Sequence, residues 1–435
     1  MVAGRHRLPA PPRGLRAMAG RLSWGLADQA ASSLTNFAVG IYVARELGAV
    51  AFGVFSIAWV TYGVLINVSR GLATDPLMVR FSGVATESWR GAVARSAGTA
   101  LAVGVASGVL SLLLGLAIGG SVGAAFVALG VILPALLLQD AWRFAFFASG
   151  EGRRALANDL VWAGALVPAM VLAAGQGSVV AFLLAWGGSA AVAAAYGCVQ
   201  TRLVPRLTAV RAWLVEQRDL GTRYLVENVS NSGGSQLRMY GLGAIAGLAD
   251  VGAVRGAELL LGPFLAVLMG LASVGVAEAA RVLRRDARKL PWFCAALGGG
   301  QAAGVLLWGL ALLVLLPDSV GRLVLGDVWA PASALIVPLT LSVTNASFIT
   351  GAAAGLRALG ASRRSMRCQL IASAAYVAGG LSGAAISGAE GSAWGVAAAT
   401  LFGAVVWWAQ FRAAQRDVPA PEGTSTPTGE ARQAA

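Results

Sequence analysis

Charged residues are scarce in this sequence. Asp, Glu, Lys and Arg make up 12% of the 435 residues, whereas hydrophobic residues reach 57% and the mean hydropathy is +0.71. A soluble domain carries about 25% charged residues, so this composition excludes an ordinary soluble protein. The chain is therefore predicted to be an all-α polytopic membrane protein.

Histidine and cysteine are also scarce. The single histidine, His6, lies in the N-terminal tail, which excludes histidine-based acid/base catalysis and most metal chemistry. The cysteines, Cys198, Cys294 and Cys368, stand far apart and lack the spacing of a metal site or a disulfide framework. No metal and no cofactor are expected, and a coupling ion (H+ or Na+) stays open.

Twelve apolar stretches reach the length of about 20 residues that a membrane crossing needs. They are predicted at 23–46, 53–80, 96–119, 122–148, 156–175, 179–200, 222–246, 253–280, 291–316, 331–357, 365–387 and 392–412. A basic tail, residues 1–21, leads directly into a full-length span, so no signal peptide is expected. Residues 413–435 are rich in Pro, Thr, Gly and Glu and are predicted to form a disordered tail.

The basic residues are dispersed between the spans, although the net charge is +13. The two tails and the even-numbered loops hold 28 of the 33 Lys and Arg residues. The odd-numbered loops hold Arg45, Arg255 and Arg322, while Arg70 and Arg238 lie inside spans. By the positive-inside rule, both termini are expected in the cytoplasm. Membrane topology thus explains the charge, and no nucleic-acid partner is expected.

The segment Asp28–Gly53 recurs as Glu227–Gly252. The glycines Gly48 and Gly53 and their counterparts Gly247 and Gly252 are separated by 199 residues (247 − 48 and 252 − 53). The same offset relates three polar pairs: Asp28 and Glu227, Ser32 and Asn231, and Asn36 and Ser235. Within each copy these polar residues recur every four positions, so they share one helix face. The chain is predicted to contain two copies of one membrane unit.

The repeat predicts two six-helix bundles, at residues 22–200 and 221–412, joined by a cytoplasmic linker at 201–220. Both copies begin on the same side of the membrane, so the repeat is parallel and its axis follows the membrane normal. Paired halves of this kind suit alternating access, with the substrate held between them near the midplane.

Two arginines lie inside spans, where charges usually face a cavity or a partner. Arg238 lies nine residues before Gly247, hence roughly 13 Å deep at 1.5 Å per residue. Glu258, at roughly 9 Å in the adjoining helix, can reach it. Either the two form a pair that only fixes helix packing, or Arg238 faces a cavity for an anionic substrate.

Arg70 lies deeper, roughly 26 Å from the outer turn, with Asp28 and Asp140 at similar depth. Arg143 lies one turn from Asp140, and Asn67 shares a helix face with Arg70. Pairing of Arg70 with Asp28 or Asp140 is one interpretation, and a role in a cavity is the other. The candidate cavity residues are Arg238, Arg70, Asn36, Asn67, Asn231 and Ser235, and the candidate partner or gate residues are Asp28, Glu227, Glu258, Asp140 and Arg143.

Four segments carry a resemblance to a known family: ADQAASSLTNF, VARELGAVAFGVFS, QDAWRFAFFASGEGRRALANDL and LRALG followed by RR. They resemble the polysaccharide-biosynthesis branch of the MOP exporter superfamily. These Wzx-like flippases of lipid-linked oligosaccharides are relatives of the lipid II flippase and of the MATE drug exporters. The resemblance covers roughly residues 20 to 412. It implies a V-shaped pair of six-helix bundles that flips an undecaprenyl-diphosphate-linked glycan outward, with Arg70 and Arg238 as candidate cavity cations.

The implied chemistry is reasonable, because guanidinium groups bind the oxygens of a diphosphate with bidentate hydrogen bonds. Membrane lipids would surround the transporter in the bacterial plasma (inner) membrane, and a polysaccharide polymerase and glycosyltransferases are candidate partners. A cation-coupled multidrug antiporter of the same superfamily is the alternative. An enzyme, such as a membrane-embedded glycosyltransferase or polymerase, is disfavoured, because the outward loops are too short to carry catalytic acids.

The topology can be tested with reporter fusions. We expect external signals at Gly120, Gly177 and Gly388, and cytoplasmic signals at Arg154, Arg211 and Arg364. An external signal at Arg211 would contradict the division into two parallel halves.

Overall fold

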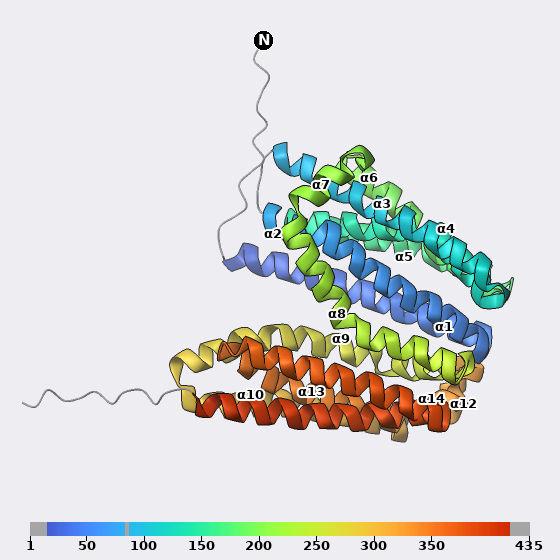
Figure 1. The fold of residues 1–435 in the computed structure, drawn as a ribbon. Helices are drawn as coiled ribbons and strands as arrows, with labels where there is room; N and C mark the ends of the chain where they lie inside the picture. The colour runs from blue at the N-terminus through green and yellow to red at the C-terminus, as the bar shows by residue number, and fades with distance from the viewer. Residues whose placement is uncertain (1–14, 83–86, 418–435) are drawn as a thin grey trace, which may run out of the picture.

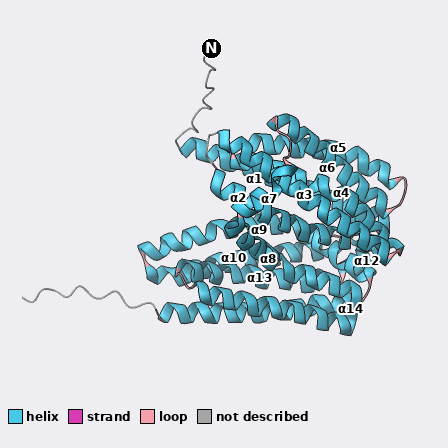
Figure 2. Ribbon diagram, turned by 45° about the horizontal axis from the view of Figure 1, so that its top comes forward, coloured by secondary structure: helices cyan, strands magenta, loops and turns pink. Residues whose placement is uncertain are grey.

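The computed structural model describes residues 15–82 and 87–417. The side chains of residues 15–32, 87–88, 231, 263–274, 277 and 362 lie outside this description. The outer parts of the two predicted tails, 1–14 and 418–435, also lie outside it. All regular elements in the described ranges are helices (Figure 2).

The helices fall into two sets. The first set is α1 (Leu15–Ser69), a π-helical turn (Arg70–Thr74), α2 (Asp75–Phe81), α3 (Glu87–Ile118), α4 (Gly120–Ala148), α5 (Gly152–Ala174) and α6 (Val179–Thr201). A 3-10 turn (Leu207–Ala209) and α7 (Val210–Glu216) follow. The second set is α8 (Arg218–Ile245), α9 (Leu248–Arg285), α10 (Leu290–Leu315), α11 (Asp318–Leu325), α12 (Trp329–Ser333), α13 (Ile336–Ala358) and α14 (Ser362–Arg416).

Two of these helices contain a break that reverses the chain. Gly48 (φ 71°) divides α1, and Gly388 (φ 58°) divides α14. Among the described residues, eight stretches are long and apolar enough to cross a membrane, and two of them, Ser33–Phe81 and Arg363–Arg416, contain these breaks. Each of the two is therefore long enough to cross twice, whereas α8 (28 residues) and α9 (38 residues) have the length of a crossing but are not among the eight. The predicted polytopic membrane fold is confirmed.

The two sets form two layers that converge at one end (Figure 1). We call this end the turn end, because α1 reverses there at Gly48 and α8 meets α9 at Gly247. The other end, where α1 begins and α14 ends, is the terminal end (Figure 1). The first segment of α1 and α8 both run from the terminal end to the turn end, so the two halves are related in parallel, as predicted.

Backbone contacts join the halves at the turn end. A Cβ atom on Gly53 would overlap the carbonyl oxygen of Leu248, and one on Gly252 would overlap that of Ala49. Both contacts obey the repeat, since 248 − 49 and 252 − 53 equal 199. The pair is therefore self-complementary about a pseudo-twofold axis. Only glycine allows two helix backbones to approach this closely, and the contact closes the turn end.

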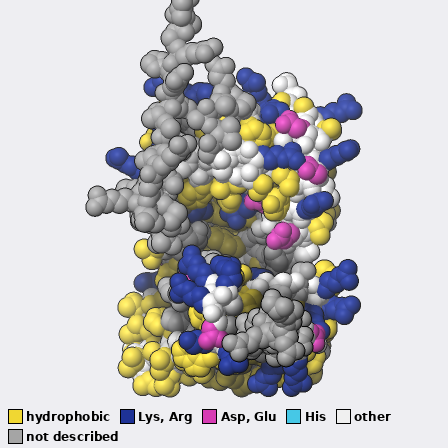
Figure 3. Space-filling view, turned by 90° about the vertical axis from the view of Figure 1, so that its left-hand side faces the viewer, with side chains coloured by type: hydrophobic (Ala, Val, Ile, Leu, Met, Phe, Trp, Pro, Cys, Tyr) yellow, Lys and Arg dark blue, Asp and Glu magenta, His cyan; other side chains and the backbone are white. Residues whose placement is uncertain are grey.

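The terminal end is open by comparison. α1 and α9 pack along each other towards the turn end, and a Cβ on Gly40 would contact the side chain of Leu259. Seen end-on in Figure 3, the terminal end is hollowed between the halves, and Lys and Arg side chains gather around it.

Residues 202–217, which we call the connection, link α6 to α8 and include helix α7. Helix α7 packs on the first half. Trp213 is fully buried and donates a hydrogen bond from Nε1 to the carbonyl oxygen of Leu72 (3.1 Å). Arg95 donates to Glu216 (2.6 Å), and its guanidinium lies 5.5 Å from the Trp213 ring. The connection is thus a docked element of the first half.

Gly53→Ala is expected to lower the apparent melting temperature of the purified protein, because overpacking costs about 1–3 kcal/mol. Gly164→Ala is the matched control, since a Cβ at this helical glycine meets nothing within 4 Å. There, alanine should be neutral or stabilising by up to about 1 kcal/mol. Equal melting temperatures for the two variants would show that the glycine contact does not hold the turn end closed.

Candidate functional site

Helix α8 is more polar than the other long helices, and it is the helix of the second half that faces the first half. It runs diagonally from α7 towards the second half (Figure 1). It packs on α1 and the π-helical turn of the first half and on α14 of the second. Polar groups at membrane depth need partners or a water-filled space, so the contacts of α8 define the candidate site.

One face of α8 is joined to the first half by a row of polar contacts, which we call the polar seam. From the turn end to the terminal end, these contacts are Tyr240 Oη with Thr61 Oγ1 (2.8 Å), Asn67 Nδ2 to Ser232 Oγ (3.2 Å) and Asn228 Nδ2 to Asp75 Oδ2 (2.7 Å). The α8 residues are spaced by eight and four positions, which keeps them on one face. Near the terminal end, Gly71 packs directly on the backbone of Leu225. The seam closes this side of the space between the halves.

Arg238 lies on another face of α8 and is 1% exposed. Its Nη2 donates to Glu258 Oε1 (2.8 Å), and Arg255 Nη1 donates to Glu258 Oε2 (2.8 Å). The Arg238 guanidinium lies 5.5 Å from the ring centre of Tyr376, and Gly380 leaves room for its side chain. The three charged residues form a triad with two arginines and one carboxylate.

The triad has a buried part and an accessible part. The side chains of Arg255 and Glu258 are 26% and 27% exposed, whereas that of Arg238 is 2% exposed. Nε and Nη1 of Arg238 have no hydrogen-bond partner among the described residues. The triad therefore keeps an excess positive charge, which an anion can balance.

Arg70 begins the π-helical turn that follows α1. It makes a bidentate pair with Asp140, from Nε to Oδ2 (2.9 Å) and from Nη2 to Oδ1 (2.7 Å). Its guanidinium lies 5.0 Å from the ring centre of Phe144. The Arg70 side chain is 29% exposed, while that of Asp140 is 6% exposed. Of the two acids that the sequence offered to Arg70, the structure brings Asp140 to it.

Arg143 is paired inside the first half. Its Nε lies 3.4 Å from Oδ2 of Asp159, and its guanidinium lies 5.6 Å from the Phe147 ring. Gln139 Nε2 donates to the other carboxylate oxygen of Asp159 (3.0 Å). These residues are buried between α4 and α5, so Arg143 stabilises the packing of the first half in this state.

The remaining candidates are not gathered into one cluster. Asn36 is partly buried on α1, Asn67 belongs to the polar seam, and Ser235 is exposed and donates to the carbonyl oxygen of Ser232 (2.9 Å). Glu227 is exposed, without an ion pair in the described part of the chain. The side chains of Asp28 and Asn231 lie outside the described residues.

Three charged residues of the interior were missed in the sequence. Arg255, which was counted with the loops, lies within α9, and its spacing of three from Glu258 was the available signal. Asp159 and Asp75 gave no such signal, because their partners lie on other helices. Within the described ranges, no group of three or more His, Cys, Asp and Glu residues could hold a metal ion.

These observations define a class of structure: two parallel-related helical bundles, closed at one end, with paired charges within each bundle and polar contacts between them. No protein-family model and no curated protein sequence matches the chain. Solved structures do match, over nearly the whole length.

A multidrug resistance MATE family transporter of the MOP superfamily, in an inward-facing conformation, is 16% identical with a TM-score of 0.61, covering 92% of this chain and 99% of its own. The lipid II flippase MurJ, in an inward closed conformation, is 10% identical with a TM-score of 0.65, covering 90% of this chain and 87% of its own. A MOP superfamily transporter from Pyrococcus furiosus is 17% identical with a TM-score of 0.53, covering 92% and 96%.

The similarity is one of fold, and this chain has the MOP-like polytopic membrane fold.

Asp140→Asn is expected to lower the apparent melting temperature, because Arg70 loses its counter-charge. For a partly exposed arginine, we expect a loss of about 2 kcal/mol. The double variant Arg70→Gln/Asp140→Asn should regain much of that stability, since it removes both members of the pair. A single variant as stable as the parent would mean that the pair contributes nothing to folding.

Proposed function

We propose that this protein is a MOP-superfamily transporter that flips an undecaprenyl-diphosphate-linked oligosaccharide, a precursor of a cell-surface polysaccharide. It would move the precursor from the inner to the outer leaflet of the bacterial plasma membrane by alternating access. The fold shared with MurJ and MATE transporters supports transport. The choice of substrate class depends on the charges between the helices.

The triad of Arg238, Glu258 and Arg255 is the observation that carries the proposal. A diphosphate has about two negative charges and several acceptor oxygens, which match guanidinium groups. Arg255 is partly exposed, and the buried Arg238 lies behind Glu258. An anionic headgroup first meets Arg255, and Arg238 becomes available when Glu258 moves aside. Arg70, also partly exposed, is the candidate cation nearer the terminal end.

The two ends of the molecule suggest the order of events. Lys and Arg gather at the terminal end, which by the positive-inside rule faces the cytoplasm (Figure 3). The headgroup enters there, between the halves, while the lipid tail stays in the bilayer. The glycine contact at the turn end must then open to release the headgroup outside.

A cation-coupled multidrug antiporter is the alternative, and the fold shared with MATE transporters favours it. Such a transporter needs a carboxylate that is available to a cation. Asp140, Asp159 and Glu258 are each paired with an arginine in this state, which speaks against it. Asp75 and Glu227 carry no ion pair in the described part of the chain and are the carboxylates that such an antiporter would use. The coupling ion, H+ or Na+, and the partner polymerase and glycosyltransferases remain part of the proposal.

Substitutions in the triad test the substrate class. If Arg238 binds the diphosphate, Arg238→Lys should transport poorly and Arg238→Ala hardly at all, because lysine lacks the bidentate fork. Both variants should still insert into the membrane. Surface glycan display, measured alongside membrane protein level, gives the readout, and Arg322→Gln, an exposed arginine on α11, is the matched control.

The double variant Arg238→Ala/Glu258→Ala separates binding from packing. If the pair only stabilises the fold, single variants lose protein level and the double variant recovers both level and transport. Full transport by the double variant would exclude a substrate-binding role for Arg238. Normal protein level without glycan display in the double variant supports the proposal.

A further inference from the structure

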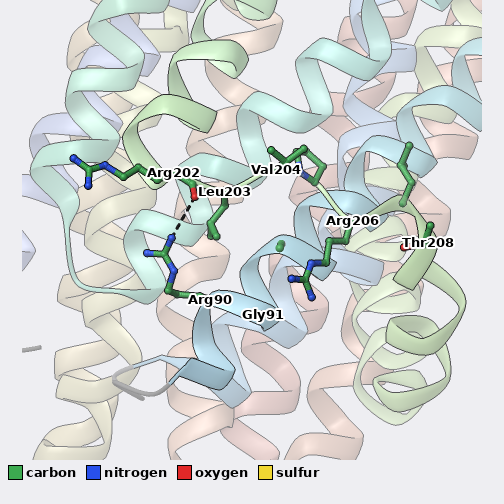
Figure 4. Close-up of a pocket in the computed structure, with 10 residues that line it drawn as sticks. Arg90, Gly91, Arg202, Leu203, Val204, Arg206 and Thr208 are labelled. Atoms are coloured by element: carbon green, nitrogen blue, oxygen red, sulfur yellow. Dashed lines mark hydrogen bonds between the residues drawn. The ribbon is translucent and has the colours of Figure 1, made fainter. Parts of the chain in front are cut away.

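A cavity lies outside the space between the halves. It occupies about 860 Å³ at the terminal end of the first half, between the start of α3 and the connection that follows α6. Its lining includes Arg90, Gly91, Arg202, Arg206 and Thr208 (Figure 4). The proposed transport reaction does not use this cavity.

The cavity is cationic. Arg90 and Arg206 lie on either side of Gly91, while the side chain of Arg202 extends away from them (Figure 4). None of the three arginines forms an ion pair among the described residues, and no carboxylate lines the cavity. Arg90 donates through Nη2 to the carbonyl oxygens of Thr201 (3.4 Å) and Arg202 (3.2 Å), which leaves its other nitrogens for a ligand.

The walls of the cavity are built by the fold. The backbone N–H of Arg206 donates to the carbonyl oxygen of Ala94 (2.9 Å), and Gly98 allows the connection to touch α3 directly. The connection is therefore held against α3 independently of the arginine side chains. A Cβ on Gly91 would meet nothing within 4 Å, so the cavity is open above this residue.

Exposed apolar side chains adjoin the arginines. Val204 and Leu207 of the cavity wall are 75% and 52% exposed, and Val199, near the end of α6, is 70% exposed. Basic groups beside exposed apolar groups at the end of a membrane helix match the boundary between lipid headgroups and acyl chains. A soluble phosphate compound would have no use for these apolar neighbours.

We propose that this cavity binds the phosphate group of an anionic membrane phospholipid. Arg90 and Arg206 hold the phosphate above Gly91, and the acyl chains lie against Val199 and Leu207. Because the cavity wall is the connection between the halves, the bound lipid fastens that connection to α3. This inference is independent of the substrate proposed above.

The test uses the full-length protein, purified in detergent, with phosphatidylglycerol as the probe and phosphatidylcholine as the neutral lipid. We expect phosphatidylglycerol to raise the apparent melting temperature saturably, and phosphatidylcholine to do so far less. Arg206→Gln should weaken the apparent affinity about tenfold, since it removes a charged hydrogen bond to phosphate. Gly91→Leu should abolish the shift by filling the cavity.

Two controls keep the result interpretable. Arg153→Gln removes an exposed arginine at the same end outside the cavity, and Gly188→Leu adds a side chain at an open helical glycine of α6. Both should keep the full lipid-dependent shift. Equal shifts with the two lipids, or a full shift in Arg206→Gln and Gly91→Leu, would overturn the proposal. A shift of the same size with inorganic phosphate alone would also overturn it, because the apolar neighbours would then contribute nothing.

Discussion

The structure depends on a backbone contact between two glycines and two carbonyl groups. Gly53 packs on Leu248 and Gly252 on Ala49, and the contact is the same in both directions because the two copies are related by the repeat. In a bilayer the hydrophobic effect does not drive helices together, so close packing of small residues does this instead. The two halves therefore meet at the glycines of the turn end. They diverge where the helices carry larger side chains, which leaves a space between the halves towards the terminal end.

Charges in the interior serve a different purpose from the glycines. The four interior arginines, at positions 70, 143, 238 and 255, each contact a carboxylate. The polar seam joins the halves through neutral groups and Asp75, whose hydrogen bonds can be exchanged for water at modest cost. An apolar seam of equal area would resist wetting. The polar seam is thus suited to separating as the halves move apart. The glycine contact is suited to holding the turn end tightly closed.

Sequence periodicity predicted the crossings, the two halves and their parallel relation, because these follow from local composition and an exact offset. It also predicted that Arg238 and Glu258 lie within reach, since both depths could be counted from one turn. It did not choose between Asp28 and Asp140 for Arg70, or find the contact between Asn228 and Asp75. Those pairs depend on how helices rotate and cross, and side-chain packing rather than residue spacing decides both.

The π-helical turn at Arg70–Thr74 holds one residue more than an α-helical turn would. An α-helix advances about 100° per residue, so reverting this turn to α geometry would rotate α2 by roughly that angle relative to α1. The rotation would carry Asp75 off the face that meets Asn228, and it would turn Arg70 relative to Asp140. The extra residue thus couples the contact between Asp75 and Asn228 to the pair of Arg70 and Asp140. A change in the geometry of this turn would alter both contacts.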